Sequence, residues 1–299
     1  MIEVESLSHS FGSRQVLENL SFRVEQGEIF GLVGPDGAGK TTLVRALTGI
    51  LEPKAGRIRT LGSPRPETVR NQVGVIPQAF TLYGDLTVWE NIRLFGSMYG
   101  ADSGAADRKG EEILTFTNLY PFRNRLADAL SGGMKRKLAV AAGLLHSPKL
   151  FVLDEPTTGV DPVSRREIWN LLYELNRGGL TIFVTTPYMD EAELCTRTAF
   201  LHDGALLACD TPRALCEAFP GHILELVAPV RDVRPLLEGV PIRETNAFGN
   251  TFHLVVDDAQ FAADAVRKAL DRAGVAVEAL REVAPTLEDV FVEMAREAA

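Results

Sequence analysis

Hydrophobic and polar positions follow two periods along the first part of the chain, which predicts strands interleaved with helices. Residues 2–8 and 20–25 alternate apolar and polar side chains, as half-buried strands do. Unbroken apolar runs, typical of strands inside a parallel sheet, occur at 29–33, 150–153 and 180–185. Shorter strands are predicted at 56–61, 73–76, 198–201 and 205–209. Helical patterns occupy 42–47, 87–118 (broken at 100–104), 135–146, 163–176 and 212–219. The pattern therefore predicts an α/β fold.

The pattern changes after Pro220-Gly221, where we place a domain boundary between residues 1–220 and 221–299. The second segment predicts strands at 222–227, 241–245, 251–256 and 275–280 and helices at 230–237, 260–272 and 287–296. Strand, helix, strand, strand, helix, strand is the order of a small ferredoxin-like α+β domain. This segment carries no catalytic constellation that we recognise.

Composition limits the classes of protein to which the chain could belong. It has 299 residues and a net charge of −9, so a sequence-independent nucleic-acid surface, which needs a basic face, is not expected. Its three cysteines have no metal-ligand spacing and fit a reducing compartment. Residues 1–5 are acidic and strand-like, so we expect no signal peptide there. No apolar run approaches the ~20 residues of a bilayer span. We therefore expect a soluble chain whose membrane role, if any, comes through a partner.

One glycine-rich loop organises the first domain. Residues 34–41 read GPDGAGKT and match G-x-x-x-x-G-K-[ST], between an apolar strand and the start of a helix. The backbone N–H groups of such a loop, with the helix N-terminus, can surround a polyphosphate. Lys40 would supply a cation for the outer phosphates, and the Thr41 hydroxyl would ligate Mg²⁺. The predicted nucleotide-binding residues here are Gly34, Pro35, Asp36, Gly37, Ala38, Gly39, Lys40, Thr41 and Thr42.

Two carboxylates follow the buried strand at 150–153. Ligands bind at the carboxyl ends of strands in open α/β sheets, so we expect Asp154 and Glu155 near the phosphate loop. Asp154 can hold Mg²⁺ through water, and Glu155 can accept a proton from an attacking water. These two residues, together with Lys40, predict phosphoryl transfer to water.

Three further positions have two interpretations each on local grounds. Phe11, before a turn, could stack on a nucleobase or pack in the core. Gln78 could be a functional loop residue or simply solvated. Ser131, Gly132 and Gly133 could form a second anion site or an ordinary capped helix start.

Together these motifs resemble the ATP-binding subunit of an ABC transporter over about residues 2–220. In that family, 34–41 corresponds to Walker A and 153–155 to the end of Walker B, with Glu155 as catalytic glutamate. Residues 130–134, LSGGM, resemble the signature LSGGQ. The resemblance favours the functional interpretation of Phe11 (adenine stacking), Gln78 (Mg²⁺ and the membrane partner) and Ser131, Gly132 and Gly133, and it places Asp161 at the D-loop. Residues 285–291 resemble the accessory domain of drug-resistance (ABC-2) exporter ATPases.

The resemblance implies a P-loop NTPase cassette with a mostly parallel central sheet, antiparallel N-terminal strands and a helical insert at about 85–145. It implies ATP and Mg²⁺ as ligands and an integral membrane permease as partner in trans, with no nucleic acid. The subunit would be cytoplasmic, peripheral on the inner face of the cell membrane. Two such subunits enclose two ATP molecules, each between Walker A of one and the signature of the other, so a homodimer and a heterodimer are both open.

Two positions depart from the family pattern. Asp36 stands where Asn is usual, and we expect little effect because the loop binds through its backbone. Pro187 stands where the family has a switch histidine that contacts the γ-phosphate. Proline offers no side-chain or backbone donor. We therefore expect this chain's own site to bind ATP with a weakened hydrolytic step, while its intact signature completes a site on another subunit.

Two alternatives remain at this stage. The chain could be a nucleotide-gated regulatory subunit with negligible turnover, which Pro187 favours and Glu155 disfavours. It could also be a soluble ABC ATPase acting on ribosomes or DNA, although it has neither a second cassette nor the extended heptads of such proteins.

Overall fold

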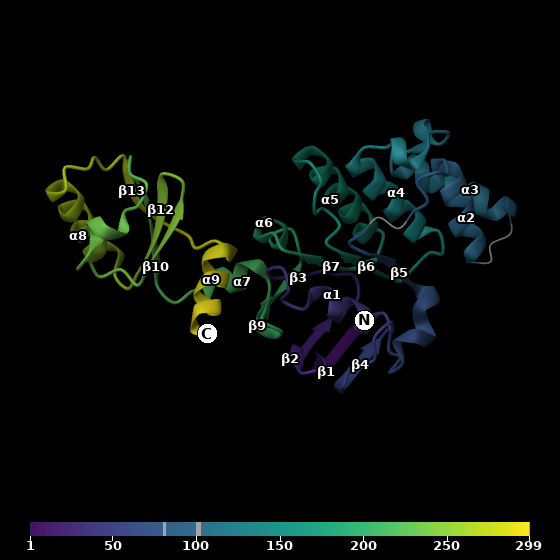
Figure 1. The fold of residues 1–299 in the computed structure, drawn as a ribbon, viewed down its shortest axis with the longest axis horizontal. Coiled ribbons are helices and arrows are strands. Elements are labelled where there is room, and N and C mark those ends of the chain that lie inside the picture. The colour runs from purple at the N-terminus through teal and green to yellow at the C-terminus, as the bar shows by residue number, and fades with distance from the viewer. Residues whose placement is uncertain (80–81, 100–102, 299) are drawn as a thin grey trace. The chain divides into compact units, whose positions relative to one another are not determined.

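The computed structural model describes residues 1–79, 82–99 and 103–298, which divide into two compact units, Met1–Pro212 and Arg213–Ala299 (Figure 1). This division falls between residues 212 and 213, and the domain boundary predicted between residues 220 and 221 remains a prediction. Each unit has its own apolar core. The predicted α/β class is confirmed for the first unit.

A six-stranded sheet forms the centre of the first unit, in the order β5-β6-β7-β3-β8-β9. All neighbours are parallel except β9, which forms a hairpin with β8. Every residue of β3, β6 and β7 is buried, as their apolar sequences predict. The strands are β3 (Ile29–Val33), β5 (Val73–Ile76), β6 (Leu150–Asp154), β7 (Thr181–Thr186), β8 (Arg197–His202) and β9 (Ala205–Asp210).

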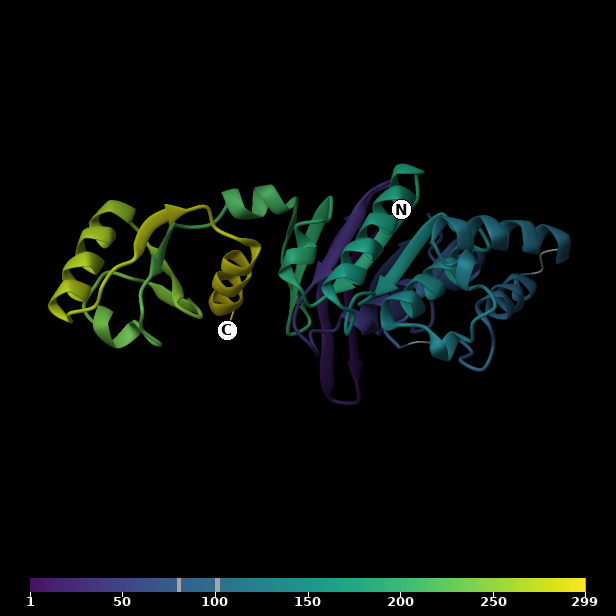
Figure 2. The same ribbon diagram turned by 90° about the horizontal axis from the view of Figure 1, so that it is seen from above.

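Alternate side chains of these strands enter two different cores. On β6, Val152 packs with α1 (Lys40–Leu47) and the N-terminal strands, whereas Leu153 packs with the helices of the other face. A second, antiparallel sheet of order β2-β1-β4 covers the α1 side. Its strands are β1 (Ile2–Phe11), β2 (Arg14–Val24) and β4 (Ala55–Thr60), and Figure 2 shows the β1–β2 hairpin in purple as a long ribbon. The central sheet is thus enclosed on both faces.

The helices of the other face include the predicted insert. Thr87 caps α2 in the expected capping box: its hydroxyl accepts a hydrogen bond from the Glu90 amide, and its own amide donates to the Glu90 carboxylate. Of the predicted break at 100–104, residues 100–102 lie outside the described residues, and Gly104 lies within α3. The helices are α2 (Val88–Met98), α3 (Ser103–Phe116), α4 (Gly132–Leu144), α5 (Pro162–Arg177) and the short α6 (Met189–Ala192). Three 3-10 turns, at Pro66–Gln72, Tyr120–Phe122 and Ala127–Ala129, were not predicted.

The C-terminal unit has the predicted ferredoxin-like topology. Its sheet has the order β11-β12-β10-β13 and is antiparallel throughout. Its apolar face packs against α8, whose buried side chains include Val266 and Leu270. The strands are β10 (His222–Val227), β11 (Glu244–Phe248), β12 (Thr251–Val256) and β13 (Ala279–Val283). The unit begins within α7 (Pro212–Glu217), and its other helices are α8 (Ala259–Arg272) and α9 (Leu287–Glu297).

Three sequence predictions are wrong in this unit. The helix predicted at 230–237 is only a 3-10 turn at Arg234–Leu237. Pro235 has no backbone N–H to donate, and the Arg234 N–H donates to the Asp232 carboxylate instead. The strand predicted at 241–245 lies at Glu244–Phe248, beyond Pro241, which cannot donate to a ladder. The strand predicted at 275–280 lies at Ala279–Val283, because the Val275 amide closes the end of α8 on Leu270.

A cluster of charged side chains lies between this sheet and α9. His253 on β12 contacts the buried carboxylate of Asp289 at 3.0 Å, and Arg296 donates to Glu293 at 2.8 Å. Glu244 on β11 faces the same cluster. Burial, with the negative charge of Glu293, raises the pKa of the Glu244 carboxyl, while Arg296 opposes this. The ionised form of Glu244 is therefore unfavourable in the folded unit.

We expect Glu244→Gln to raise the free energy of unfolding of the C-terminal unit at pH 7 by roughly 0.5 kcal/mol. The pKa of Glu244 is higher in the folded chain than in the unfolded chain. Glu244 therefore stabilises the fold fully at pH values below its unfolded-state pKa, and this stabilisation is lost as the pH rises through its folded-state pKa. The gain from the variant should therefore disappear near about pH 4. Thermal unfolding at both pH values measures it, with the exposed Glu238→Gln as control. A lower Tm for Glu244→Gln at pH 7 contradicts this account.

Candidate functional site

The loop between β3 and α1 has the backbone conformation that a phosphate loop needs. Gly37 and Gly39 take positive φ values of 83° and 111°, which side chains disfavour. Gly34 packs closely against the backbone of Leu201: a Cβ at this position would lie 2.1 Å from the Leu201 carbonyl oxygen, so a side chain would not fit. Helix α1 begins at Lys40, directly after Gly39. The loop thus curls at the start of a helix, where free N–H groups and the helix dipole favour an anion.

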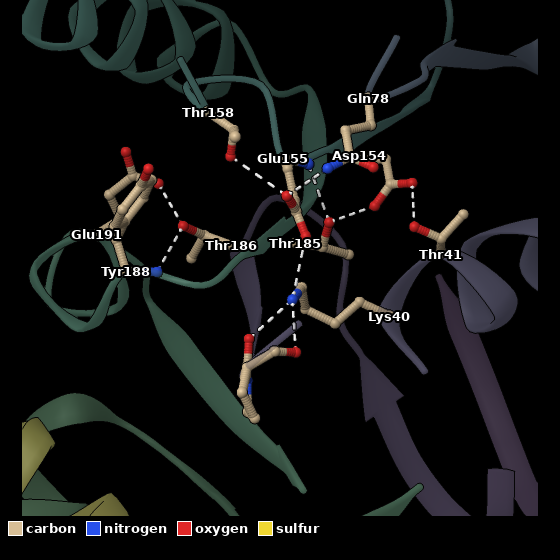
Figure 3. Close-up of polar contacts among 12 residues, drawn as sticks. Lys40, Thr41, Gln78, Asp154, Glu155, Thr158, Thr185, Thr186, Tyr188 and Glu191 are labelled. Carbon is tan, nitrogen blue, oxygen red and sulfur yellow. Dashed lines mark hydrogen bonds and ion pairs between the residues drawn. The ribbon is translucent and has the colours of Figure 1, made fainter. Parts of the chain in front are cut away.

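Lys40 lies folded into this loop and is only 4% exposed. Its Nζ donates to the carbonyl oxygens of Gly34 at 2.8 Å and Pro35 at 3.0 Å. The same ammonium group forms an ion pair with Glu155 Oε1 at 3.0 Å (Figure 3). Its positive charge is therefore held beside the glycine loop and satisfied by protein oxygens.

Glu155 follows the last residue of β6 and has an unusual backbone. Its φ of 48° lies in the left-handed region, which costs a non-glycine residue about 1 kcal/mol or more. The Glu155 amide is fixed by the Thr185 carbonyl oxygen at 3.1 Å and hydroxyl at 3.0 Å. Its other carboxylate oxygen accepts from Gln78 Nε2 at 2.8 Å and from the Thr158 hydroxyl at 3.2 Å. The strained turn directs the carboxylate toward Lys40 and Gln78 (Figure 3).

Asp154 and Thr41 hold oxygen atoms that could bind a metal ion. Thr41 Oγ1 donates to Asp154 Oδ2 at 2.8 Å, and Thr185 Oγ1 donates to Asp154 Oδ1 at 2.6 Å. Mg²⁺ at phosphate sites takes one or two protein oxygens together with the phosphates. A hydroxyl and a carboxylate held side by side at the phosphate loop fit that requirement.

Part of the loop and Glu155 line a pocket of about 520 Å³, whereas Asp154 is not one of its described lining residues. Phe11 stands at its rim, is 50% exposed and packs edge-on against His9 with ring centroids 4.7 Å apart. An aromatic side chain so exposed is not a core residue, so the local interpretation of Phe11 as core is wrong. The lining residues are Phe11, Arg14, Val16, Asp36, Gly37, Gly39, Lys40, Thr41, Thr42, Gln78 and Glu155. Arg14 and Val16 were not predicted as site residues, although their nearness in sequence to the turn after Phe11 was a usable signal.

The predicted signature and D-loop residues lie at the starts of two helices. Ser131 caps α4 by accepting from the Met134 amide at 3.3 Å, and Gly133 lies so close to Ser164 that a Cβ would be 2.3 Å from its Oγ. Asp161 caps α5 through the amides of Val163 and Ser164, and the hydrogen bonds from Ser164 lower its carboxyl pKa. Among the described residues that line the pocket around Lys40, none comes from these two helix starts.

A buried carboxylate organises the turn that contains Pro187. Glu191 on α6 is 1% exposed and accepts from the Thr157 hydroxyl at 2.6 Å. It also accepts from the Thr186 hydroxyl at 2.6 Å (Figure 3). Arg165 Nε lies 3.5 Å from Glu191 Oε1, and its guanidinium carbon lies 4.2 Å from the Tyr188 ring centroid. Pro187 is half-buried between Thr186 and Tyr188. Glu191 was not predicted as a functional residue, because nothing in the sequence distinguishes this acid from the neighbouring Asp190 and Glu193.

Comparison with known protein families gives two matches. Residues 17–158 match the ABC transporter family, and residues 211–295 match the C-terminal domain of DrrA1-3-like ATP-binding proteins. Among the described residues, no helix is both long and apolar enough to cross a bilayer.

Individual relatives extend the similarity over nearly the whole chain. The Nod factor export ATP-binding protein I of a Rhizobium species (strain N33) is 38% identical over 306 residues, covering 98% of this chain and 96% of that protein. The probable multidrug ABC transporter ATP-binding protein YbhF of Escherichia coli is 36% identical over 285 residues, or 92% of this chain. The chain spans only about half of YbhF, 48% of its length.

Among solved structures, the cassette MJ0796 in a dimeric post-hydrolysis state bound to ADP and Pi is similar with a TM-score of 0.65 and 26% identity. The match covers 71% of this chain and 98% of that chain. The fold of an ATP-binding cassette therefore agrees with the topology described above.

Proposed function

The chain belongs to the family of ABC transporter ATP-binding proteins, and from that membership we propose that it binds and hydrolyses ATP to drive a membrane exporter. The observation that carries the proposal is the meeting of Lys40, Asp154 and Glu155 at one glycine loop. Lys40 Nζ and Glu155 Oε1 are 3.0 Å apart, and Thr41 Oγ1 and Asp154 Oδ2 are 2.8 Å apart. These distances bring an ammonium group, a hydroxyl–carboxylate pair and a second carboxylate together beside one glycine loop.

Each of these residues would have a separate role in phosphoryl transfer to water. The loop amides and Lys40 would hold the phosphates, and Phe11 would stack on the adenine. Thr41, Gln78 and, through water, Asp154 would hold Mg²⁺, which when bound neutralises phosphate charge. As the phosphates draw Lys40 toward them, the Glu155 carboxylate would lose its ion pair and become free to accept a proton from the attacking water. Positioning and electrostatic stabilisation supply most of the rate enhancement in such sites.

The experiment that tests this proposal is equilibrium dialysis of the folded chain against labelled ATP and Mg²⁺. We expect Lys40→Ala to weaken uptake by about 10- to 100-fold, because a charge-assisted hydrogen bond to phosphate contributes roughly 1.5–3 kcal/mol. Lys149→Ala, which removes an exposed lysine of the same unit, serves as the control and should bind as the wild type does. No uptake by the wild type, or equal uptake by Lys40→Ala, contradicts the proposal.

The assembly we propose has two ATPase subunits and an integral membrane permease. Each nucleotide would lie between the phosphate loop of one subunit and Ser131, Gly132 and Gly133 of the other, and Asp161 would face the partner subunit. The insert at about 85–145 and the Gln78 region would contact the permease on the inner face of the membrane. The relatives named for multidrug and Nod factor export support the direction of transport, out of the cell.

Pro187 supports a specialised role for this subunit. It follows β7 where the family places a histidine, and it has no donor for the γ-phosphate. The chain would then hold ATP with a slow hydrolytic step in its own site, while its signature completes a faster site on a different ATPase subunit. The limiting case is the second candidate function, a nucleotide-gated regulatory subunit with negligible turnover.

We expect Pro187→His to raise the single-turnover hydrolysis rate of the purified chain by about ten-fold, below the 10²–10⁴ range of a fully placed proton-transfer group. The comparison uses saturating ATP, so that binding does not limit the rate. The control, Pro187→Ala, adds the same backbone N–H that histidine adds but no imidazole, and it should leave the rate unchanged. A wild-type rate that histidine does not improve counts against the impaired site.

A further inference from the structure

Arg136 joins the helix that begins with the signature to the loop that carries Gln78. It lies on α4, within two turns of Ser131, and its guanidinium reaches the segment that follows β5. Nη1 donates to the Pro77 carbonyl oxygen at 3.2 Å, and Nη2 donates to the Gln78 carbonyl oxygen at 2.5 Å. One side chain therefore holds two successive carbonyl groups 58 and 59 residues away in sequence.

The contacts continue from Gln78 into the phosphate site. Gln78 Nε2 donates to Glu155 Oε2 at 2.8 Å, and Glu155 Oε1 lies 3.0 Å from Lys40 Nζ. Arg136 thus fixes the backbone of a residue whose side chain fixes the carboxylate next to Lys40. The chain of contacts runs without interruption from α4 to the glycine loop.

We propose that Arg136 is a positioning residue that couples the helix carrying Ser131, Gly132 and Gly133 to Gln78 and Glu155. Through it, a change in the phosphate site of one subunit moves the anion-binding helix start that the same subunit offers to its partner, and the reverse. The inference rests on the proposed ATPase function and adds a residue and a direction of coupling to it.

The chemistry of the guanidinium suits this role. Its planar fork presents two separate N–H groups in a fixed geometry, one for each of two neighbouring carbonyl oxygens, whereas a lysine would have to reach both from a single nitrogen. Burial lowers the pKa of Arg136, and the nearby Glu155 carboxylate opposes that shift.

The test is a double-mutant cycle on the full-length chain, with Arg136→Gln, Gln78→Ala and the pair. Equilibrium dialysis gives ATP uptake, and single-turnover hydrolysis at saturating ATP gives the rate. We expect Arg136→Gln to leave uptake within about two-fold of the wild type but to lower the rate about ten-fold, since misplacement of a catalytic group has effects of this order. When Gln78 is already alanine, Arg136→Gln should lower the rate by less than about two-fold, because the side chain that links Arg136 to Glu155 is absent.

Two matched variants separate coupling from a general structural effect. Lys137→Gln removes a neighbouring positive charge on α4, whose ion pair goes to Glu167 on α5 at 2.5 Å, and it should leave the rate unchanged. Arg136→Lys keeps the charge but not the fork, and it should restore part of the lost rate. The inference is wrong if the effects of Arg136→Gln and Gln78→Ala on the rate multiply, or if Arg136→Gln and Lys137→Gln lower the rate equally. Either result leaves the proposed function intact. Absence of ATP uptake by the wild type overturns the proposed function, and this inference with it.

Discussion

Replacing Glu155 with glutamine is expected to lower the single-turnover hydrolysis rate by about 10²–10⁴-fold, the contribution of a placed proton-transfer group. Glutamine has the shape of glutamate and can still accept from Gln78 and Thr158, which lie 2.8 and 3.2 Å from Glu155 Oε2. It cannot accept the proton of an attacking water. It also loses the ion pair with Lys40, which frees the ammonium group for phosphate.

ATP uptake by Glu155→Gln should therefore equal or exceed that of the wild type, because one negative charge is removed beside the phosphates. Dialysis and single-turnover hydrolysis on the same preparation measure both quantities. Thr158→Val provides a matched control, since it removes one hydrogen bond to the carboxylate at 3.2 Å and should reduce the rate by less than about ten-fold. A Glu155→Gln rate within about five-fold of the wild type would exclude Glu155 as the base.

Replacing Glu191 with alanine is expected to lower the free energy of unfolding of the first unit by about 3–5 kcal/mol, as for the breaking of other buried charge pairs. Glu191 is 1% exposed and holds the hydroxyls of Thr157 and Thr186 with the guanidinium of Arg165. Truncation leaves the two hydroxyls without their acceptor inside the protein, and it leaves Arg165 without its buried counter-charge. The expected loss of stability is large because Glu191 joins three segments: the turn after Glu155, the end of β7 and helix α5.

Urea unfolding of the full chain, followed by probes in the first unit, measures this effect, since two units need not unfold together. Asp190→Ala is the matched control: its side chain is 70% exposed, so its ion pair with Arg165 at 3.3 Å should contribute less than about 1 kcal/mol. Glu191→Gln should lie between the two, because an amide oxygen can accept from only part of the set. A loss below about 1 kcal/mol for Glu191→Ala would show that the turn is held by packing alone.

Local patterns were sufficient for most elements and for the phosphate loop. The motif at 34–41, the apolar run before Asp154 and the capping box at Thr87 each lie within a few residues, so the sequence can show them directly. Local patterns failed at 230–237, where a helical distribution of apolar residues was outweighed by Pro235 and by the Asp232 turn. Glu191 and Arg136 were missed because their importance depends on burial and on partners from other segments.

By itself, the sequence determined that a strand, a glycine turn and a helix follow one another, and that two acids follow a buried strand, because these depend on backbone period and short-range chemistry. Only the tertiary structure decided that Glu155 contacts both Lys40 and the Gln78 side chain, and that Arg136 reaches the Gln78 backbone. Those contacts exist because the strand order β5-β6-β7-β3 brings the ends of separate strands to one edge of the sheet. Strand order is a property of the folded chain, set by packing between segments far apart in sequence, and no local period encodes it.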